Sequence, residues 1–424
     1  MASKLVVWFE GERVGHISRS GRGDIIFQYT PAWLEGKDSF PISLSLPFQS
    51  PPFSKEASSS FFDNLLPEEE VRKQVADNNR LSTTDIFGLL QAIGADCAGA
   101  LSILRPNQAP DFRAYTYQPL PIAELPAFLA ELRINPLGSG NTPSRLSLAG
   151  AQNKTSLFLS NGSLQHYARP CNGAPGTHIV KLLSPRFPNL AENELFCTLL
   201  ARAFGLDTPE VGLTPTLERA LLIRRYDRTQ MVNDGVRRVR RIHQEDFCQA
   251  LGVPRTRKYQ SQGGPGFRQC FTVLDRCHDP EGDRRKIFRW AVFNYLIGNA
   301  DAHAKNISLL YDEPPRPRLA PFYDLVCTAV YPLKKNMAMK IGRKSNPDHV
   351  HGSDWTQLIA LTKIPLDEGR HILQEMAAVP DFLLDNARDK FFAVYGQVPL
   401  VFQIAATIRD RAALVRAALE KIRC

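Results

Sequence analysis

The stretch Gly298–Leu310, GNADAHAKNISLL, and the later FYDL at Phe322–Leu325 decide how this chain is interpreted. Asp301 and Asn306 stand five residues apart, and Asp324 supplies a second acid further along. An Asp carboxylate can accept the proton of an attacking hydroxyl group. An Asn and a second Asp offer the oxygen ligands that a hard cation such as Mg²⁺ prefers. One such residue alone would be explained by capping of a helix or turn, but three at these spacings favour chemistry.

The spacing between these residues matches the D-x-x-x-x-N pattern of a protein-kinase catalytic loop. Phosphoryl transfer needs mainly positioning and charge neutralisation, so a few residue types in fixed places suffice. NISLLYD (306–312) alternates as a strand would, EPPRPR supplies a turn, and LAPFYDL resumes the extended pattern. Upstream, FRWAVFNYLIGN (288–299) has apolar residues at helical spacing and ends in Gly-Asn. The pattern predicts a catalytic loop after a buried helix, and a hairpin that returns Asp324 to it.

The 424 residues have an ordinary globular composition, with 43% hydrophobic and 22% charged residues, and suggest two to three domains. The formal net charge of +9 is partly local, because Glu218–Arg241 contains eight arginines. This segment favours phosphate-bearing partners such as nucleotides or nucleic acid, and a solvated basic loop explains it equally well. The eight cysteines are scattered without a C-x-x-C pair, and no apolar run approaches the roughly 20 residues of a membrane helix. We therefore expect a soluble cytoplasmic protein without a membrane partner.

The chain divides into four predicted parts. Residues 1–105 form a small domain with strands and two helices, the first of them over residues 58–76. Residues 106–143 form a connection with one amphipathic helix. Residues 144–226 follow the order of a kinase small lobe, and residues 227–424 are expected to be a mainly helical large lobe. The fold class is thus α+β: a protein-kinase-like bilobal fold with a β-rich N-terminal subdomain and a mainly helical C-terminal lobe.

Lys181 is the predicted phosphate contact of the small lobe. It interrupts the apolar strand GTHIVKLL, where burying an unpaired ammonium group would cost free energy, and this favours a functional role. The alternative is a lysine whose ammonium group reaches solvent while its methylene groups pack on the strand. Glu194 is the acid expected to steady it, with Glu192 as the rival. The turn SLAGAQNK would lay backbone N–H groups and Lys154 over phosphates, although a single glycine makes it a poor glycine-rich loop. In RRYDR, Tyr226 would pack against adenine or serve as a core aromatic residue.

The chain resembles the HipA family of bacterial serine/threonine-kinase toxins over essentially its whole length. The number and order of the shared strings make the resemblance specific. These strings are FFDNLLP at Phe61–Pro67, RLSLAGAQNKTSL at Arg145–Leu157, HIVKL around Lys181, NELFCTLLARAFGL from Asn193, QEDFCQALGVPRTRKYQSQGGPG at Gln244–Gly266, and the GNADAHAKN and FYDL strings quoted above.

The resemblance implies roles for individual residues. Asp301 would be the proton acceptor, Asn306 and Asp324 the ligands of Mg²⁺, and Lys181 the catalytic lysine on the phosphates of ATP. Ser147 corresponds to the serine that the family autophosphorylates, and the charge added there would shut off ATP binding. The residues that the resemblance places at the nucleotide, besides Lys181, Asn306 and Asp324, are Ala149, Gly150, Ala151, Gln152, Asn153, Lys154, Arg224, Arg225, Tyr226, His303, Lys305 and Tyr323.

The resemblance also implies partners. Proteins of the family block translation by phosphorylating an aminoacyl-tRNA synthetase, typically the glutamyl one, and are held by HipB, a helix-turn-helix antitoxin, on operator DNA. We expect a HipB-like antitoxin and contact with operator DNA mainly through it, because the family's DNA-contacting lysines have no clean counterpart near Lys340 to Lys344. The chain departs from the family at Arg224, where the family has an acid.

Two other functions fit parts of the sequence. A metal-dependent phosphoesterase shares the D-x-H string at Asp301–His303 but requires GD-x-x-D and G-H-x-H motifs, which the chain lacks. A catalytically idle co-repressor in an antitoxin–DNA complex would not need the catalytic positions, which are intact. ATP consumption by the purified protein and by an Asp301→Ala form would separate these functions.

Overall fold

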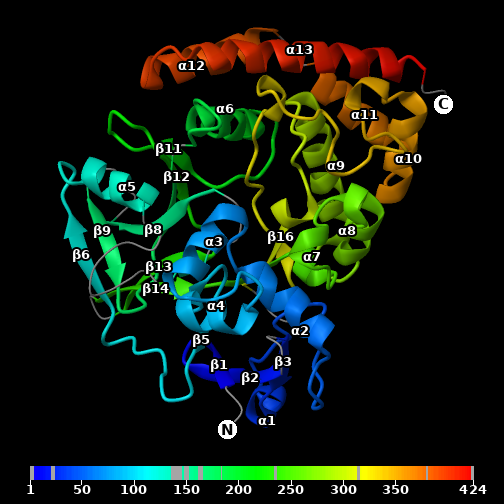
Figure 1. Ribbon diagram of the computed structural model, residues 1–424. Helices are drawn as coiled ribbons and strands as arrows, with labels where there is room; N and C mark the ends of the chain where they lie inside the picture. The colour runs from blue at the N-terminus through cyan, green and yellow to red at the C-terminus, as the bar shows by residue number, and fades with distance from the viewer. Residues whose placement is uncertain are drawn as a thin grey trace. The chain divides into compact units, whose positions relative to one another are not determined.

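The structure is a computed structural model, and it contains helices and strands in the α+β class expected from the sequence (Figure 1). Its residues group into two compact units. Unit 1 comprises Met1–Leu183, Thr214–Arg255 and Leu309–Pro315, and unit 2 comprises Ser184–Leu213, Thr256–Ser308 and Arg316–Cys424. The expected domain boundaries stay a prediction. The residues that the structure describes are 4–20, 24–134, 146–147, 152–160, 166–182, 184–233, 236–312, 316–378 and 381–421.

The first sheet of unit 1 forms where apolar and polar residues alternate. Along β3 every second residue is buried, because successive side chains point to opposite faces of a strand. The β1–β2 hairpin turns at Glu10 and Gly11, both with positive φ. The strand order is β3-β2-β1-β5. The bounds are β1 Lys4–Phe9, β2 Glu12–Ser20, β3 Asp24–Tyr29 and β5 Leu101–Leu104, with helices α1 Pro31–Glu35, α2 Lys55–Phe62, α3 Glu69–Asn78 and α4 Ile86–Ile93.

The single helix expected over residues 58–76 is broken in the structure. Helix α2 ends at Phe62, a 3-10 turn covers Asp63–Leu65, and α3 begins only at Glu69. Leu66 is extended, with φ −86° and ψ 154°. The ring of the proline that follows excludes the helical region for this residue. The prediction of a continuous helix was therefore wrong, and the proline within the segment is the physical reason.

A second sheet of unit 1 carries the strands expected for the small lobe. The leucines of helix α5 (Leu125–Ile134), which lies beside this sheet in Figure 1, pack with Leu157, Val180 and Leu222 from three different strands. This apolar contact gives the sheet one buried face. The strands lie in the order β12-β10-β8-β9-β6, with the bounds β6 Thr116–Leu120, β8 Lys154–Leu159, β9 Tyr167–Cys171, β10 His178–Lys181 and β12 Leu221–Arg224.

The arginine-rich segment forms strands, where a mainly helical region was expected. Strands β13 (Arg228–Asn233) and β14 (Val236–Arg241) pair as an antiparallel hairpin, with Arg228 directly opposite Arg241. Both arginines are buried, at 6% exposure each. Asp96 makes this burial tolerable because its Oδ1 lies 3.0 Å from Arg228 and 3.3 Å from Arg241. The basic charge of the segment therefore has a partly structural role.

Unit 2 is built around helix α9 (Pro280–Leu296). The helix begins with a proline, and the Asp279 side chain caps it by accepting the Gly282 N–H at 3.0 Å. Gly298 follows its end with φ +67°, as the Gly-Asn signal predicted. Helices α8, α10, α11 and α13 all contact α9 (Figure 1). Other elements are α6 Leu190–Ala203, β11 Val211–Leu213, α8 Phe267–Leu274, β17 Arg318–Leu319, α10 Gly352–Thr362, α11 Leu366–Ala377, α12 Asp381–Tyr395 and α13 Pro399–Leu419.

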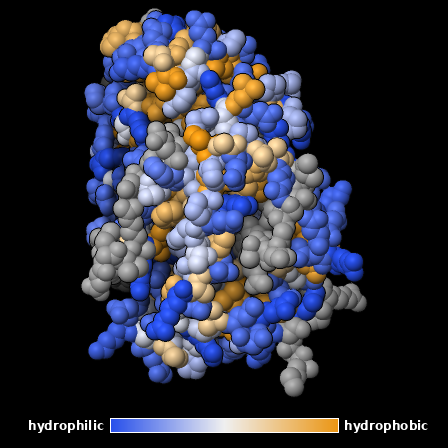
Figure 2. Space-filling model, turned by 90° about the vertical axis from the view of Figure 1, so that its left-hand side faces the viewer, coloured by the Kyte–Doolittle hydropathy of each residue, from blue (hydrophilic) through white to orange (hydrophobic). Residues whose placement is uncertain are grey.

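The helices within the described ranges include no candidate for a membrane-spanning segment. None of the helices there is both long enough and apolar enough to cross a bilayer. On the face drawn in Figure 2, hydrophobic residues lie interspersed among hydrophilic ones. Single exposed hydrophobic side chains, such as Phe382 and Val394 of α12, are ordinary on protein surfaces.

Glu245 is a fully buried acid that joins two parts of unit 1. It lies in β15 (His243–Asp246) and accepts hydrogen bonds from the hydroxyls of Ser43 and Tyr311, both at 2.5 Å. A third donor is the backbone N–H of Leu44 at 3.0 Å. Burial raises the pKa of the Glu245 carboxyl to about 7, and these hydrogen bonds offset the effect only in part.

We expect this acid to make stability depend on pH. The folded protein keeps the Glu245 proton up to pH about 7, whereas the unfolded chain releases it near its ordinary pKa of 4.5. The free energy of unfolding should therefore fall as pH rises between these values and stay level above them. Glu245→Gln should remove this part of the slope because an amide does not titrate. Urea unfolding across this pH range measures the effect, with exposed Glu12→Gln as the control, and an unchanged slope in Glu245→Gln would contradict it.

Candidate active site

The loop from Gly298 to Asn306 is held by the buried side chain of Asn299. Asn299 Nδ2 donates to Asn294 Oδ1 at 2.8 Å and to the backbone oxygen of Asp324 at 3.4 Å. Asn299 Oδ1 accepts the backbone N–H of Asp301 at 3.0 Å. One amide therefore connects the start of the loop to the segment that carries the second acid, all within unit 2.

The Asp301 carboxylate is hydrogen-bonded and is also exposed to solvent. Its side chain is 54% exposed, and Tyr259 donates its hydroxyl to Asp301 Oδ1 at 2.5 Å. The Nε2 atom of buried His303 lies 3.8 Å from the same oxygen. The His303 ring meets the Tyr259 ring edge-on, with 5.3 Å between centroids. A carboxylate oriented in this way can accept a proton from a hydroxyl group that approaches from solvent.

Asn306 and Asp324 offer oxygen atoms beside the same loop. Asn306 Nδ2 donates to the backbone oxygen of Asp301 at 3.1 Å, so its Oδ1 points away from that carbonyl group. Asp324 has φ +55°, a left-handed conformation that Asp tolerates better than most residues and that recurs at functional sites. No three His, Cys, Asp or Glu side chains gather as a metal site in the part of the chain that the structure describes. A Mg²⁺ ion held by these two residues would complete its shell with phosphate and water oxygens.

Helix α6 fixes the backbone just after Asp324. Asn193 is fully buried, and its Oδ1 accepts the Cys327 N–H at 2.9 Å. Its Nδ2 donates to the Cys327 carbonyl oxygen at 3.0 Å. One side chain thus satisfies both backbone groups of Cys327, which sets the path of the chain three residues beyond the acid.

The residues expected along the nucleotide in unit 2 lie on this loop or, in the case of Tyr323, contact it. Tyr323 donates its hydroxyl to the backbone oxygen of Lys305 at 2.7 Å. Its oxygen is also 2.6 Å from the hydroxyl of Ser308, which begins strand β16 (Ser308–Tyr311). His303 and Lys305 are both buried. The structure brings these residues together with Asp301, while their contacts with a nucleotide stay a prediction.

Two lysines stand opposite each other in unit 1. Lys181 of β10 is the direct antiparallel partner of Lys154 of β8, so both side chains leave the same face of the sheet. Two ammonium groups on one face of the sheet could both contact the phosphates of a nucleotide. Glu194 and Glu192, the expected partner of Lys181 and its rival, are both buried on α6 in unit 2. A pairing of either glutamate with the lysine stays a prediction.

The turn before Lys154 is described in part. Gln152 Nε2 donates to the Leu182 carbonyl oxygen at 2.8 Å, and the Leu182 N–H donates to the Asn153 carbonyl oxygen at 3.0 Å. These bonds join the end of the turn to the chain just after Lys181. Ala149, Gly150 and Ala151 lie outside the described residues.

Ser147, the expected autophosphorylation residue, is described by its backbone. It lies in β7 (Leu146–Ser147), which pairs in parallel with β4 (Asp96–Cys97) and places Cys97 opposite Ser147. Buried arginines also contact β4, because Arg225 and Arg228 each donate to the Cys97 carbonyl oxygen at 3.4 Å. The strand that carries Ser147 therefore rests on a segment anchored by buried charge.

Arg224, Arg225 and Tyr226 follow one another at the end of β12 but have different surroundings. Arg224 is exposed and Arg225 is buried. Arg225 donates to both carboxylate oxygens of Asp227, at 2.9 and 2.7 Å. The Arg225 guanidinium is therefore committed to an ion pair, and nucleotide contacts by the three residues stay a prediction.

Sequence reasoning missed three residues of this arrangement: Tyr259, Asn193 and Asn299. All three occur in strings that were already singled out. The strings carry no signal for their roles, because Tyr259 lies 42 residues before the carboxylate that it contacts and Asn193 lies 134 residues before Cys327. Only the packed structure shows which groups they reach.

The family model described as HipA-like C-terminal domain matches residues 146–382. The model described as HipA N-terminal domain matches residues 5–104. Together the two matches cover most of the chain.

Individual relatives agree with these matches. The chain is 40% identical over 418 residues to "Putative kinase Y4mE" of Sinorhizobium fredii, covering 94% of this chain and 98% of that protein. It is 30% identical over 354 residues to "Serine/threonine-protein kinase toxin HipA" of Shewanella oneidensis, covering 80% and 78%. The solved complex of HipA, HipB and operator DNA from Shewanella oneidensis contains a chain that matches with a TM-score of 0.82 at 24% identity, over 99% of both chains. This last likeness shows a shared fold.

We expect Asn193→Ala to loosen the segment after Asp324. The substitution leaves both backbone groups of Cys327 buried without their partner, which should cost about 1–3 kcal/mol of stability. Hydrogen exchange in a peptide that contains Cys327 should become faster, and the urea midpoint should fall. Asn386→Ala on the exposed surface of α12 is the control and should change stability by less than about 0.5 kcal/mol. Equal effects of the two substitutions would contradict the role given to Asn193.

Proposed function

We propose that this chain, which belongs to the HipA family of serine/threonine kinases, is a toxin that transfers the γ-phosphate of ATP to a hydroxyl group of a protein. The observation that carries the proposal is the hydrogen-bonded link from Asp301 through Asn299 to Asp324, with Asn306 bound to the same loop. Phosphoryl transfer depends on such positioning of a proton acceptor and of metal-holding oxygens.

In the proposed reaction, the acceptor hydroxyl loses its proton to Asp301 as its oxygen bonds to the γ-phosphorus, and ADP leaves. Tyr259 orients the carboxylate through its hydrogen bond. Bound Mg²⁺ would neutralise charge on the phosphates, with Asn306 and Asp324 as its protein ligands. Lys154 and Lys181 would contact the phosphates from their shared face of the sheet.

The protein that is phosphorylated and the partner that regulates the kinase are further parts of the proposal. We propose an aminoacyl-tRNA synthetase, of the glutamyl type, as the phosphorylated protein and a halt of translation as the consequence. A HipB-like antitoxin would neutralise the toxin and carry it to operator DNA. The support for this partner is the likeness in fold to the HipA chain that was solved together with HipB and DNA.

Replacing either acid tests the catalytic proposal. Asp301→Ala should lower the rate of phosphoryl transfer roughly 100-fold or more, because it removes the proton acceptor. Asp324→Ala should abolish transfer because it removes a metal ligand. Release of ADP by purified protein measures both, and Asp389→Ala on the surface of α12 should keep full activity. Full activity in either acid variant would refute the mechanism, and an inactive unmodified protein would favour the idle co-repressor.

Incubation with Mg-ATP tests the proposed switch. Mass spectrometry should find one added phosphate on Ser147, followed by a loss of activity because the new charge repels the nucleotide phosphates. Ser147→Ala should stay active for longer, and Asp301→Ala should remain unphosphorylated. Phosphate found only at other residues would count against the switch and leave the kinase proposal standing.

A further inference from the structure

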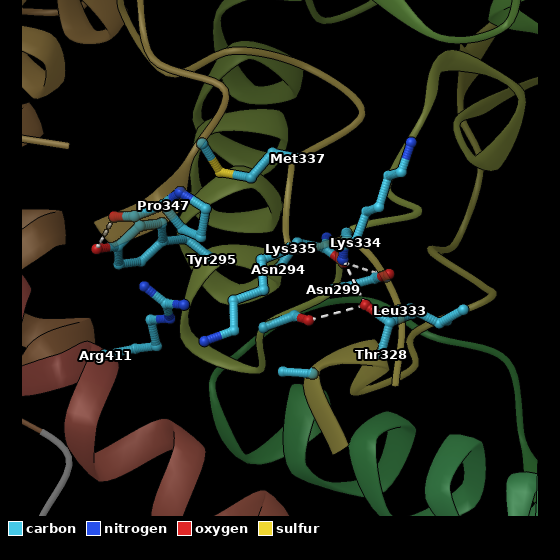
Figure 3. A pocket seen from close by; sticks show the side chains of 13 residues that line it. Asn294, Tyr295, Asn299, Thr328, Leu333, Lys334, Lys335, Met337, Pro347 and Arg411 are labelled. Carbon is cyan, nitrogen blue, oxygen red and sulfur yellow. Dashed lines mark hydrogen bonds between the residues drawn. The ribbon is translucent and has the colours of Figure 1, made fainter. Parts of the chain in front are cut away.

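A pocket of unit 2 opens beside the candidate catalytic loop. The space between its lining residues measures about 350 Å³, a figure that includes solvent outside its open mouth. One wall is formed by Gly298, Asn299 and Ala300, the three residues that lead into Asp301, and Lys335 and Arg411 lie among the other lining residues (Figure 3). Asn299, which connects the loop to Asp324, lines the pocket, whereas Asp301, Asn306 and Asp324 do not.

Cationic side chains line this pocket. In Figure 3 the Lys335 side chain extends toward Arg411, whereas the neighbouring Lys334 extends away. Arg411 is 8% exposed and is placed by Asp348, whose Oδ1 lies 2.6 Å from its NH1 atom. Its guanidinium also lies 5.5 Å from the Tyr295 ring centroid. Asp348 therefore balances one cation, and the described lining residues include no acid of their own.

The polar wall of the pocket is rigidly joined to the loop. Thr328 Oγ1 accepts the Ala300 N–H at 2.7 Å and donates to the Gly298 carbonyl oxygen at 2.9 Å. The Ala329 N–H donates to the same carbonyl oxygen at 3.1 Å. A group bound against this wall would lie next to the backbone that positions Asp301.

We propose that this pocket binds a small oxyanion, a phosphate or carboxylate group, between Lys335 and Arg411. Lys335 and Arg411 both offer N–H donors to this cavity, and an oxyanion between them would accept charge-assisted hydrogen bonds from both side chains. The arginine is held in place by Asp348 and Tyr295, so little freedom is lost when the anion binds. The oxyanion comes either from a free ion or from a side chain of a polypeptide that docks beside the loop.

Titration with inorganic phosphate tests the site itself. The protein is saturated with ADP to occupy the nucleotide site, and phosphate binding is followed by calorimetry. Lys335→Ala should weaken binding about tenfold, which is the loss of one charge-assisted contact. Lys335→Arg should restore it, and Lys390→Ala on the exposed face of α12 should leave it unchanged. Lys335 is exposed, so its replacement should not disturb folding.

A second arm distinguishes the two sources of the anion. Ligand-observed NMR compares a capped Ala-Asp-Ala tripeptide with its Asn counterpart. Binding of phosphate alone would assign the site to a free ion, and Lys335-dependent binding of the Asp peptide would assign it to a polypeptide side chain. The proposal is overturned if neither ligand binds, or if Lys335→Ala and Lys390→Ala bind equally well.

The test is independent of phosphoryl transfer. Asp301→Ala does not touch the pocket, and it should bind phosphate as the unmodified protein does even when it no longer turns over ATP. A pocket that binds no anion would be seen by calorimetry and NMR. A protein that is not a kinase would be seen in the ADP-release measurement.

Discussion

The candidate active site depends on how one buried amide, that of Asn299, distributes its hydrogen bonds. A buried polar group without a partner costs about 1–3 kcal/mol, so this side chain tolerates few arrangements. Its nitrogen donates hydrogen bonds to the Asn294 side chain and to the Asp324 carbonyl oxygen, and its oxygen accepts one from the Asp301 N–H. Because all of these partners must be met at once, two acids far apart in the chain are held on a common support.

Unit 1 contains a cluster of buried charged side chains. Asp96 and Asp227 share Arg225 and Arg228 in a cluster where every side chain is almost inaccessible to solvent. Burial and the neighbouring Arg225 together lower the pKa of Arg228 to about 10, although Asp227 and Asp96 act in the opposite direction. Removing one member of such a cluster leaves its partners buried and uncompensated, which costs far more than an exposed ion pair is worth. The cluster thereby makes β4 a firm support for the strand that carries Ser147.

Local patterns account for much of the fold. The strand β3, the hairpin at Glu10 and Gly11, and the end of α9 before Gly298 follow from alternation, turn chemistry and a helix stop. The arginine-rich segment was the largest error. Its excess charge indicated a solvated or partner-binding surface, but the carboxylate of Asp96, from elsewhere in unit 1, pairs with Arg228 and Arg241 and allows both to be buried. The residue pattern within one segment cannot show that a carboxylate from a distant segment will neutralise its arginines.

The sequence by itself determined the chemistry available to this protein: an acid and an amide five residues apart, a second acid after a hairpin, and a lysine within an apolar strand. Residue type and spacing are local properties, so they can be interpreted before folding is known. Only the tertiary structure decided that Tyr259 would hold the Asp301 carboxylate, that Asn193 would hold Cys327, and that two lysines would stand opposite each other. The reason is that hydrogen bonds between distant segments, and the register of paired strands, are set by packing, which no local pattern encodes.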